Sequence, residues 1–249
     1  MNIFDPKNKL VELKNPNEIL ITLDIDWAPD PVIEYCVNLL DKLSIRATFF
    51  ATHASSLISN IQSMDNFEVG IHPNFFNCKD YSKHLDEMRN DFPHAKSVRS
   101  HGLFSTSNIF DLYRKKGFAI SSDIFIPYGI NIKPFWRNRN GSLLVIPYYW
   151  EDGNYMGDGK FNIPDFSRLE YTKGIKIFNF HPIHLFTNAD SINFYNDKVK
   201  NIYHDVDKLI KIRKSYGIRN FLEELSSTIF SFQNETRTLF EFSRSALKL

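Results

Sequence analysis

The sequence is organised around one short run, residues 19–26 (ILITLDID), in which an apolar stretch ends in the carboxylates of Asp24 and Asp26. Three further apolar runs contain a histidine at or near their end: residues 47–53 (ATFFATH), 67–73 (FEVGIHP) and 175–182 (IKIFNFHP). A fifth run, residues 96–102 (KSVRSHG), is less apolar and has the same ending. Each run is typical of a buried strand that is followed by a polar residue. Because the carboxyl ends of parallel strands open onto one face of an α/β protein, we expect these acids and imidazoles to converge.

The segments between these runs have helical spacing of their apolar residues. The spacing predicts helices within residues 32–43, 57–61, 85–92 and 109–113, the last beginning at Ser105 or Thr106 and ending at Gly117. Strands that alternate with helices predict an α/β fold with a parallel sheet or barrel. Further strands are predicted within residues 118–127 and 142–150, an irregular insertion at 151–173, and helix from 206 to about 230.

Length and composition indicate a single domain over residues 1–249, with residues 231–249 as a C-terminal tail. Thirty basic and 29 acidic side chains leave a net charge of +1, and no basic block is long enough to follow a phosphate backbone, so nucleic-acid binding is not expected. No stretch approaches 18 apolar residues and the N-terminus does not have a signal-peptide pattern, which predicts a cytoplasmic protein without a membrane span. Cys36 and Cys78 are predicted to be free thiols. The sequence makes no prediction about oligomeric state.

Asp24 and Asp26 are two residues apart, so on a strand their side chains would project to the same side, with backbones roughly 7 Å apart. One carboxylate could then hold a metal ion while the other reaches its water molecule. The alternative is that the two acids cap the following helix.

His72 is the first histidine expected at this rim, because Pro73 stops its strand from continuing. A neutral imidazole in this position suits a metal ion, although a structural histidine is the alternative. His101 could supply a third protein ligand, and His53 competes for that role. Arg99 lies two residues before His101 and would keep a neighbouring carboxylate charged and oriented, unless it is a solvated surface residue.

His181 ends the most apolar run in the second half of the chain, and His184 follows it in the sequence His-Pro-Ile-His. A general acid beside a metal site would suit His181. His184 could orient His181 or contact substrate.

The order of these motifs resembles that of the polysaccharide deacetylases of carbohydrate esterase family 4, which have the NodB-homology fold. The resemblance is carried by residues 22–27 (TLDIDW), 47–50 (ATFF), 98–101 (VRSH) and 180–182 (FHP) and extends over roughly residues 18–186. It is nearest to a divergent branch associated with surface-polysaccharide and O-antigen biosynthesis. The resemblance implies a distorted (β/α) barrel of about seven parallel strands.

The resemblance also implies roles for individual residues. Asp24 corresponds to the catalytic base, Asp26 to a metal ligand, and Arg99 to the arginine that braces the base. His72 would be a second metal ligand, and His181 would protonate the leaving amine.

Two departures from the family pattern concern the same site. Ile25 separates the two aspartates, which are adjacent in the family. The family's second motif has histidines four residues apart, whereas the residue four after His72 is Phe76. The missing ligand would have to be replaced by His101, His53 or Asn74.

A group of residues after the strand at 142–150 could line a sugar site: Tyr148, Tyr149, Trp150, Glu151 and Asp152. Aromatic rings are plausible sugar platforms, and packing in the core is the alternative.

The resemblance therefore implies a metal-dependent N-deacetylase that cleaves a linear amide bond of an amino sugar, with a divalent cation, zinc being expected, and an N-acetylated sugar or glycan intermediate as substrate. Three other functions remain open from the residues. Asp-x-Asp after a first strand also occurs in Mg²⁺-dependent phosphatases of the haloacid dehalogenase type, and an Asp-x-Asp pair holds the nucleotide-sugar metal in glycosyltransferases. An inactive, carbohydrate-binding homologue of the deacetylase fold is the third.

Overall fold

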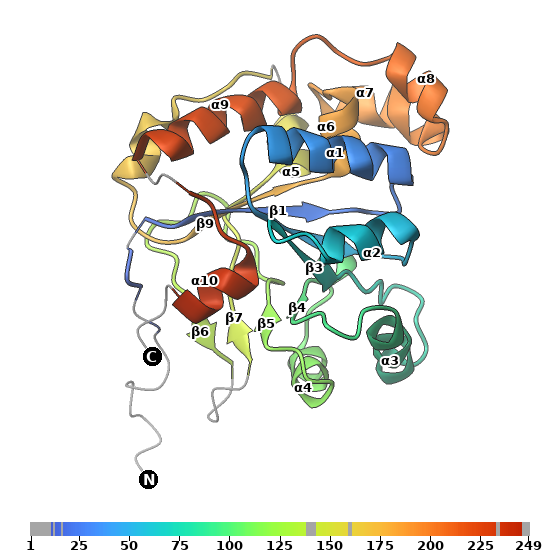
Figure 1. Ribbon diagram of the computed structural model, residues 1–249, viewed down its shortest axis with the longest axis vertical. Helices are drawn as coiled ribbons and strands as arrows, with labels where there is room; N and C mark the ends of the chain where they lie inside the picture. The colour runs from blue at the N-terminus through green and yellow to red at the C-terminus, as the bar shows by residue number, and fades with distance from the viewer. Residues whose placement is uncertain are drawn as a thin grey trace.

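One curled sheet forms the centre of the computed structural model, which describes residues 11, 13–15, 17–137, 143–158, 161–232 and 235–245 (Figure 1). Within these residues the spatial order of the strands is β6-β7-β5-β4-β3-β2-β1-β9-β8. The strands are β1 (Ile19–Asp24), β2 (Ala47–Ala51), β3 (Phe67–Ile71), β4 (Ser97–Val98), β5 (Ile120–Ser121), β6 (Phe135–Trp136), β7 (Leu144–Val145), β8 (Trp150–Glu151) and β9 (Lys176–Phe180). Only β6 is antiparallel to its neighbour, β7. The predicted distorted barrel is confirmed, but the expected count of about seven strands is too low.

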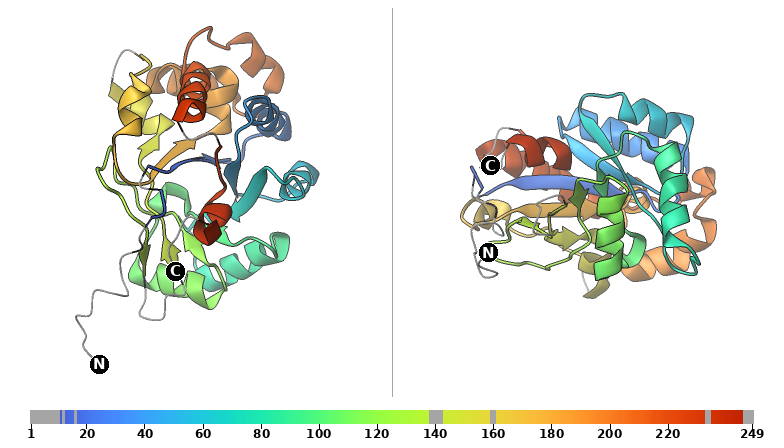
Figure 2. Two further views of the ribbon diagram at one scale, coloured as in Figure 1. Left: turned by 60° about the vertical axis from the view of Figure 1, so that its left-hand side comes forward. Right: turned by 90° about the horizontal axis from the view of Figure 1, so that it is seen from below.

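Helices pack around this sheet (Figures 1 and 2). They are α1 (Asp30–Lys42), α2 (Ser56–Gln62), α3 (Tyr81–Asp91), α4 (Ser107–Lys115), α5 (Asp152–Tyr155), α6 (Pro182–Thr187), α7 (Ile192–Phe194), α8 (Val206–Lys211), α9 (Ile218–Phe232) and α10 (Leu239–Ser245). Sequence signals locate several helix ends correctly. Thr106 caps α4 by accepting a hydrogen bond from the backbone N–H of Ile109, and Gly117 follows that helix with φ +80°.

The middle of the chain is less regular than predicted. The strand expected within residues 118–127 is reduced to β5, and the run predicted from residue 142 separates into β7 and β8, with residue 142 itself outside the described residues. Strand β6 was not predicted. The expected insertion at 151–173 contains α5 and short 3₁₀ turns, and the predicted helix from 206 is two helices, α8 and α9.

Alternation along the strands separates two apolar cores. Ile19, Ile21 and Leu23 pack against the helical layer, whereas Leu20 belongs to a second cluster inside the curled sheet. Inner-face residues of other strands and of the C-terminal helix complete this second cluster, including Phe50, Ile120, Tyr148, Ile177, Leu239 and Phe242. Thr22 and Asp24 follow the same two-residue alternation and point inward, so the inner face becomes polar at the carboxyl ends of the strands.

The C-terminal segment closes the opposite, amino end of the sheet. Leu239 and Phe242 of α10 are completely buried. The backbone N–H of Leu239 donates to Oγ1 of Thr48 over 2.9 Å, and that of Phe240 donates to Oε2 of Glu68 over 2.9 Å. Residues 235–245 are therefore not a loose tail, as the sequence suggested, but a packed part of the fold, because their two apolar side chains fill the inner core.

Candidate active site

Asp24 and Asp26 come together at the rim through a turn rather than through strand alternation. Strand β1 ends at Asp24, and Asp26 and Trp27 both have positive φ, 41° and 57°. The backbone N–H of Ala28 donates to the carbonyl of Ile25 over 2.8 Å, so residues 25–28 have the pattern of a type I′ turn. Both carboxylates lie next to His72, but Asp26 lies in this turn, so the expectation that it continues the strand is wrong.

Asp26 is at the centre of a group of possible cation ligands with His72 and His101. Its Oδ1 lies 3.2 Å from Nε2 of His72 and 3.1 Å from Nδ1 of His101. Burial would raise the pKa of Asp26, but the hydrogen bonds from His101 and His72 outweigh it and hold this pKa well below its usual range. The side chain is thus a charged carboxylate between two imidazoles.

His72 is oriented by the backbone, since its Nδ1 lies 2.7 Å from the carbonyl oxygen of Arg99 and donates to it. This hydrogen bond leaves Nε2 as the nitrogen that points at Asp26. Burial lowers the pKa of His72, but the charge of Asp24, whose Oδ1 is 4.0 Å from Nδ1, and the contact with Asp26 raise it overall. A negatively charged surrounding of this kind favours a cation.

The donor set fits a divalent metal ion. Ligands about 2.1 Å from a tetrahedrally coordinated ion lie about 3.4 Å from one another, close to the two distances observed at Asp26. Two imidazoles and one carboxylate also leave a coordination position open. The backbone hydrogen bond to His72 is the kind of second contact that orients a metal-binding histidine.

Asp24 is held on both oxygens. Nη1 of Arg99 donates to its Oδ1 over 3.0 Å, and Nδ2 of Asn179 donates to its Oδ2 over 2.9 Å. Thr22 completes the network by donating to Oδ1 of Asn179 over 2.8 Å. The carboxylate is therefore fixed at the rim, beside the group at Asp26.

Arg99 is completely buried, so the alternative of a solvated surface arginine is wrong. Its Nε donates to the carbonyl of Ser122 over 3.0 Å, and its Nη2 donates to the hydroxyl of Ser122 over 2.8 Å. The guanidinium lies between the rings of Phe50 and Tyr148, 4.4 and 4.6 Å from their centroids. Cation–π contacts and hydrogen bonds replace the lost hydration of this charge.

A second group of imidazoles surrounds Asp152, which is completely buried. Nδ1 of His181 lies 2.6 Å from Oδ1 of Asp152, and the backbone N–H of His181 donates to Oδ2 over 2.8 Å. Nε2 of His181 is directed at the first group, 3.5 Å from Oδ2 of Asp26. Nδ1 of His184 lies 3.0 Å from Oδ2 of Asp152, without hydrogen-bond alignment.

The charges of this second group stabilise each other. Burial would lower the pKa of His181, but the charge of Asp152 and its hydrogen bond raise it well above the usual value. Burial would raise the pKa of Asp152, but the positive charges of His184 and His181 hold it below its usual range. The result is an imidazolium, held by a buried carboxylate, whose free nitrogen faces Asp26.

Three residues expected near the site have other surroundings. His53 contacts its neighbour Thr52, with 3.0 Å between Nδ1 and Oγ1, and Asn74 accepts a hydrogen bond from the backbone N–H of Phe76 in a local turn. Among the described residues, His53 belongs to neither group of possible metal ligands. Trp150 is buried and stacks on Phe221 with 4.4 Å between ring centroids, so its expected sugar contact is wrong. Trp150 faces the helices, because it pairs in the sheet with Phe178, which also faces outward.

Sequence reasoning missed two residues of the site. Asn179 lies two residues before His181 on the same strand, so strand alternation could have identified it. Tyr203 donates its hydroxyl to the carbonyl of Asp26 over 2.7 Å from a segment 177 residues away, and no local pattern predicts such a contact.

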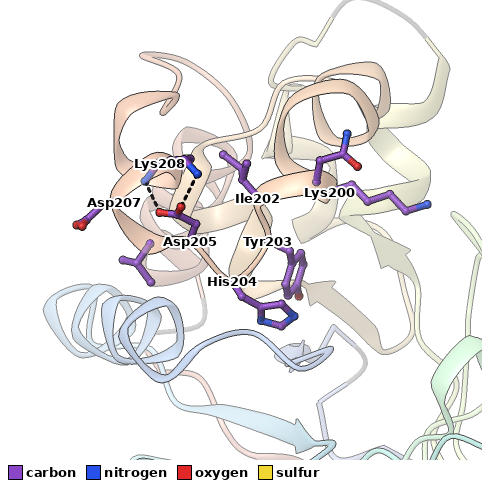
Figure 3. Close-up of a pocket in the computed structure, with 9 residues that line it drawn as sticks. Lys200, Ile202, Tyr203, His204, Asp205, Asp207 and Lys208 are labelled. Carbon is purple, nitrogen blue, oxygen red and sulfur yellow. Dashed lines mark hydrogen bonds and ion pairs between the residues drawn. The ribbon is translucent and has the colours of Figure 1, made fainter.

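Tyr203 also lines a hollow of about 750 Å³ formed by residues 200–208 (Figure 3). In this hollow Lys208 pairs with Asp205, at 2.8 Å, and the ring of His204 lies 5.2 Å from that of Tyr203. All the lining residues come from this one segment, so the hollow is separate from the group at Asp26 except through Tyr203.

The fold and the site define a class: a distorted (β/α) barrel with a group of possible cation ligands at the carboxyl ends of its strands, beside a braced aspartate and a carboxylate-bound histidine. Comparison with family models identifies the family. Residues 21–199 match the model of the WbmS-like polysaccharide deacetylases, and the chain belongs to this family.

One solved structure agrees with this assignment, and more distant ones are also similar to the chain. A Bordetella bronchiseptica protein, named as a candidate polysaccharide deacetylase involved in O-antigen biosynthesis, is 32% identical with a TM-score of 0.78, over 86% of this chain and 91% of that one. A 4-alpha-glucanotransferase from Thermococcus litoralis is 12% identical with a TM-score of 0.52, over 92% of this chain and 39% of that one, and shares the fold. A pseudoenzyme of carbohydrate esterase family 4 from Bacillus anthracis is 10% identical with a TM-score of 0.46, over 91% and 65%. No curated protein matches the chain.

Among the described residues, none of the helices combines the length and apolar character needed to cross a membrane. The cytoplasmic location stays a prediction from the sequence.

Proposed function

We propose that this protein is a metal-dependent hydrolase that removes an N-acyl group, acetyl in the simplest case, from an amino sugar. One observation carries the proposal: a braced carboxylate (Asp24), a group of cation ligands around Asp26 and a carboxylate-bound imidazole (His181) meet at one rim. Amide hydrolysis needs a proton acceptor for water and a proton donor for the leaving nitrogen, and this rim offers both.

Asp26, His72 and His101 are the proposed ligands of a divalent cation, with zinc as the proposed ion because imidazole and carboxylate are its usual ligands. When bound, the ion would lower the pKa of a water molecule and polarise the acyl carbonyl. The group around Asp152 is less suited to an ion, because both oxygens of this carboxylate already contact His181.

Asp24 is the proposed general base. It takes a proton from the water molecule that attacks the acyl carbon, and a C–O bond forms. Arg99 and Asn179 hold the two carboxylate oxygens, so Asp24 keeps one orientation during this transfer.

His181 is the proposed general acid. Asp152 holds its Nδ1, which leaves the proton on Nε2 directed at the reaction site. That proton passes to the sugar nitrogen as the C–N bond breaks, and the products are the free carboxylic acid and the amine. His184 shares Asp152 with His181 and is proposed to support this ion pair.

The proposed substrate is an N-acetylated sugar or glycan intermediate of surface-polysaccharide synthesis. The support is family membership together with the Bordetella protein, which is associated with O-antigen biosynthesis.

The test combines elemental analysis with an assay of acetate release from N-acetylated sugars. Asp24→Asn and His181→Ala should retain metal and lose about 10²–10⁴-fold in kcat, the usual contribution of general acid–base catalysis. His94→Ala is the matched control, because His94 is exposed and lies outside both histidine groups, and should behave as wild type.

Other outcomes would support the competing functions. Sugar binding without acetate release would favour the inactive homologue. A wild-type protein that takes up no transition metal, even with excess zinc, and that hydrolyses a phosphate ester with Mg²⁺ would favour the phosphatase. No observation at the site favours that second outcome, since a phosphatase would leave the imidazoles around Asp26 and Asp152 without a role.

A further inference from the structure

Two large aromatic side chains remain exposed beside the candidate cation site. Trp27 is 40% exposed and Phe76 is 51% exposed. Both contact the ring of His101 edge to face, with centroid distances of 5.1 and 6.4 Å. Exposed aromatic residues occur elsewhere, for example Tyr171, but these two share a contact with a proposed metal ligand.

Trp27 is held in an unfavourable backbone conformation. Its φ of 57° is rare for a bulky residue, and aspartate tolerates positive φ better than tryptophan does. Three contacts hold the turn in place: the backbone N–H of Trp27 donates to Oγ1 of Thr52 over 3.1 Å, that of Ile25 donates to the carbonyl of Phe50 over 3.2 Å, and Tyr203 donates to the carbonyl of Asp26. Glycine would fit this position without strain. A tryptophan that keeps 40% of its surface exposed in strained backbone indicates a binding function.

Phe76 is held over a glycine. Gly102 has φ +61°, and a Cβ added there would lie 2.6 Å from the ring of Phe76, so only glycine permits this approach. The turn that contains Asn74 fixes the backbone of Phe76 from the other side, through its side-chain oxygen. Phe76 also occupies the position four residues after His72, where the family pattern has a histidine. A phenylalanine there cannot act as a metal ligand.

We propose that Trp27 and Phe76 form a platform that binds the pyranose ring of the acylated amino sugar beside the cation site. This proposal rests on the proposed function, and it names the residues that hold the sugar. Apolar ring faces suit the C–H faces of a sugar, while the imidazoles and carboxylates next to them suit its polar edge and acyl group. Contact of both rings with His101 brings a bound sugar next to the group that contains Asp26.

The platform can be tested by tryptophan fluorescence, which does not depend on turnover. Trp27 is more exposed than Trp136, and Trp150 is buried, so a sugar on the platform should change the emission of Trp27. The probes are di-N-acetylchitobiose and the methyl glycosides of N-acetylglucosamine and N-acetylgalactosamine. Wild type should respond in a saturable way, and Phe76→Ala should weaken the Kd about tenfold, the expected effect of losing one aromatic contact.

The variant Trp27→Gly tests whether the side chain of Trp27 is needed for sugar binding and not for folding. Because glycine accepts the positive φ, this variant should keep the turn and fold, yet it should bind the probes more weakly in isothermal titration calorimetry and raise KM more than it lowers kcat. Its metal content should equal that of wild type. Tyr171→Ala, an exposed aromatic residue away from both histidine groups, is the matched control and should leave Kd unchanged.

Failure of the platform and failure of the proposed function give different results. Emission that does not respond to any probe, or a Kd unchanged by Phe76→Ala, would overturn the platform even if the enzyme is active. A saturable response that Phe76→Ala weakens would support the platform even in a protein without turnover.

Discussion

The two ends of the sheet both contain a carboxyl group with several close partners, but the partners differ in kind. At the amino end, Glu68 accepts hydrogen bonds from Thr48, Ser97 and the backbone of Phe240, and the segment before and within α10 covers it. At the carboxyl end, Asp26 has two imidazoles on one oxygen and a third near the other, and its side chain is partly open to solvent.

This difference distinguishes an acid that stabilises the fold from acids that are placed to bind a cation. At the amino end, neutral hydrogen-bond donors of the fold itself bind the carboxyl group, which suits a stable closure. The carboxyl end assembles carboxylates and imidazoles within ligand distance of one another, which suits a site that binds a cation. Changes at the carboxyl end should therefore reduce function, and changes at the amino end should alter stability alone.

The largest effect is expected at the ligands. Asp26→Ala and His72→Ala should each reduce bound metal to background and acetate release to the uncatalysed rate, because each removes a ligand from a group of three. Elemental analysis and the acetate assay measure both quantities. Metal and turnover retained in both variants would show that the cation group is assigned incorrectly.

Arg99→Met should damage both stability and activity. The change leaves Asp24 without its buried partner, and breaking such a pair usually costs about 3–5 kcal/mol. Urea unfolding should show this loss, while kcat falls and metal content stays the same. An unfolding free energy equal to that of wild type would mean that Asn179 alone satisfies Asp24.

Phe242→Ala tests the closure at the amino end. Its buried ring fills the inner core, so we expect a loss of about 3–5 kcal/mol in the free energy of unfolding. Because α10 lies away from the histidine groups, kcat and metal content of the folded protein should match wild type. A changed kcat in the folded protein would mean that packing at the amino end of the sheet influences the site at the carboxyl end.

The smallest effect is expected for Glu68→Gln. Burial raises the pKa of Glu68 above 4.5, so its contribution to stability is fully present below about pH 4.5 and decreases as pH rises through the folded pKa. Glutamine removes this dependence and can still pair with Ser97 and Phe240. Urea unfolding should therefore show equal or higher stability than wild type at pH 7.5, by about 1 kcal/mol at most, and no such gain at pH 4. A lower stability at pH 7.5 would mean that the ionised carboxylate is needed.

The alternation of apolar residues predicted much of the site because strand geometry is local. Once residues 19–24 and 175–180 are recognised as neighbouring parallel strands, the period of two directs Asp24 and Asn179 to one side. The same rule applied to β8 would have directed Trp150 away from the site, toward Phe221.

Other parts depended on contacts between distant segments. The position in which the apolar residues of the C-terminus pack could not be predicted, since closing the inner core requires a sheet that is already curled. The third member of the cation group was likewise undecided among His101, His53 and Asn74, because β4 is only two residues long and His101 begins a 3₁₀ turn.

The sequence by itself determined the α/β class, the order of the motifs and the inward direction of Asp24, because these follow from local periodicity. Only the tertiary structure decided the position of Asp26 and Trp27 in a turn with positive φ, the grouping of His101 with Asp26 and His72, the burial of Arg99 between Phe50 and Tyr148, and the closure by α10. The physical reason is that side-chain direction along a strand is set by neighbouring residues, whereas this turn, the buried ion pair of Arg99 and the closure by α10 depend on distant segments that fold against them.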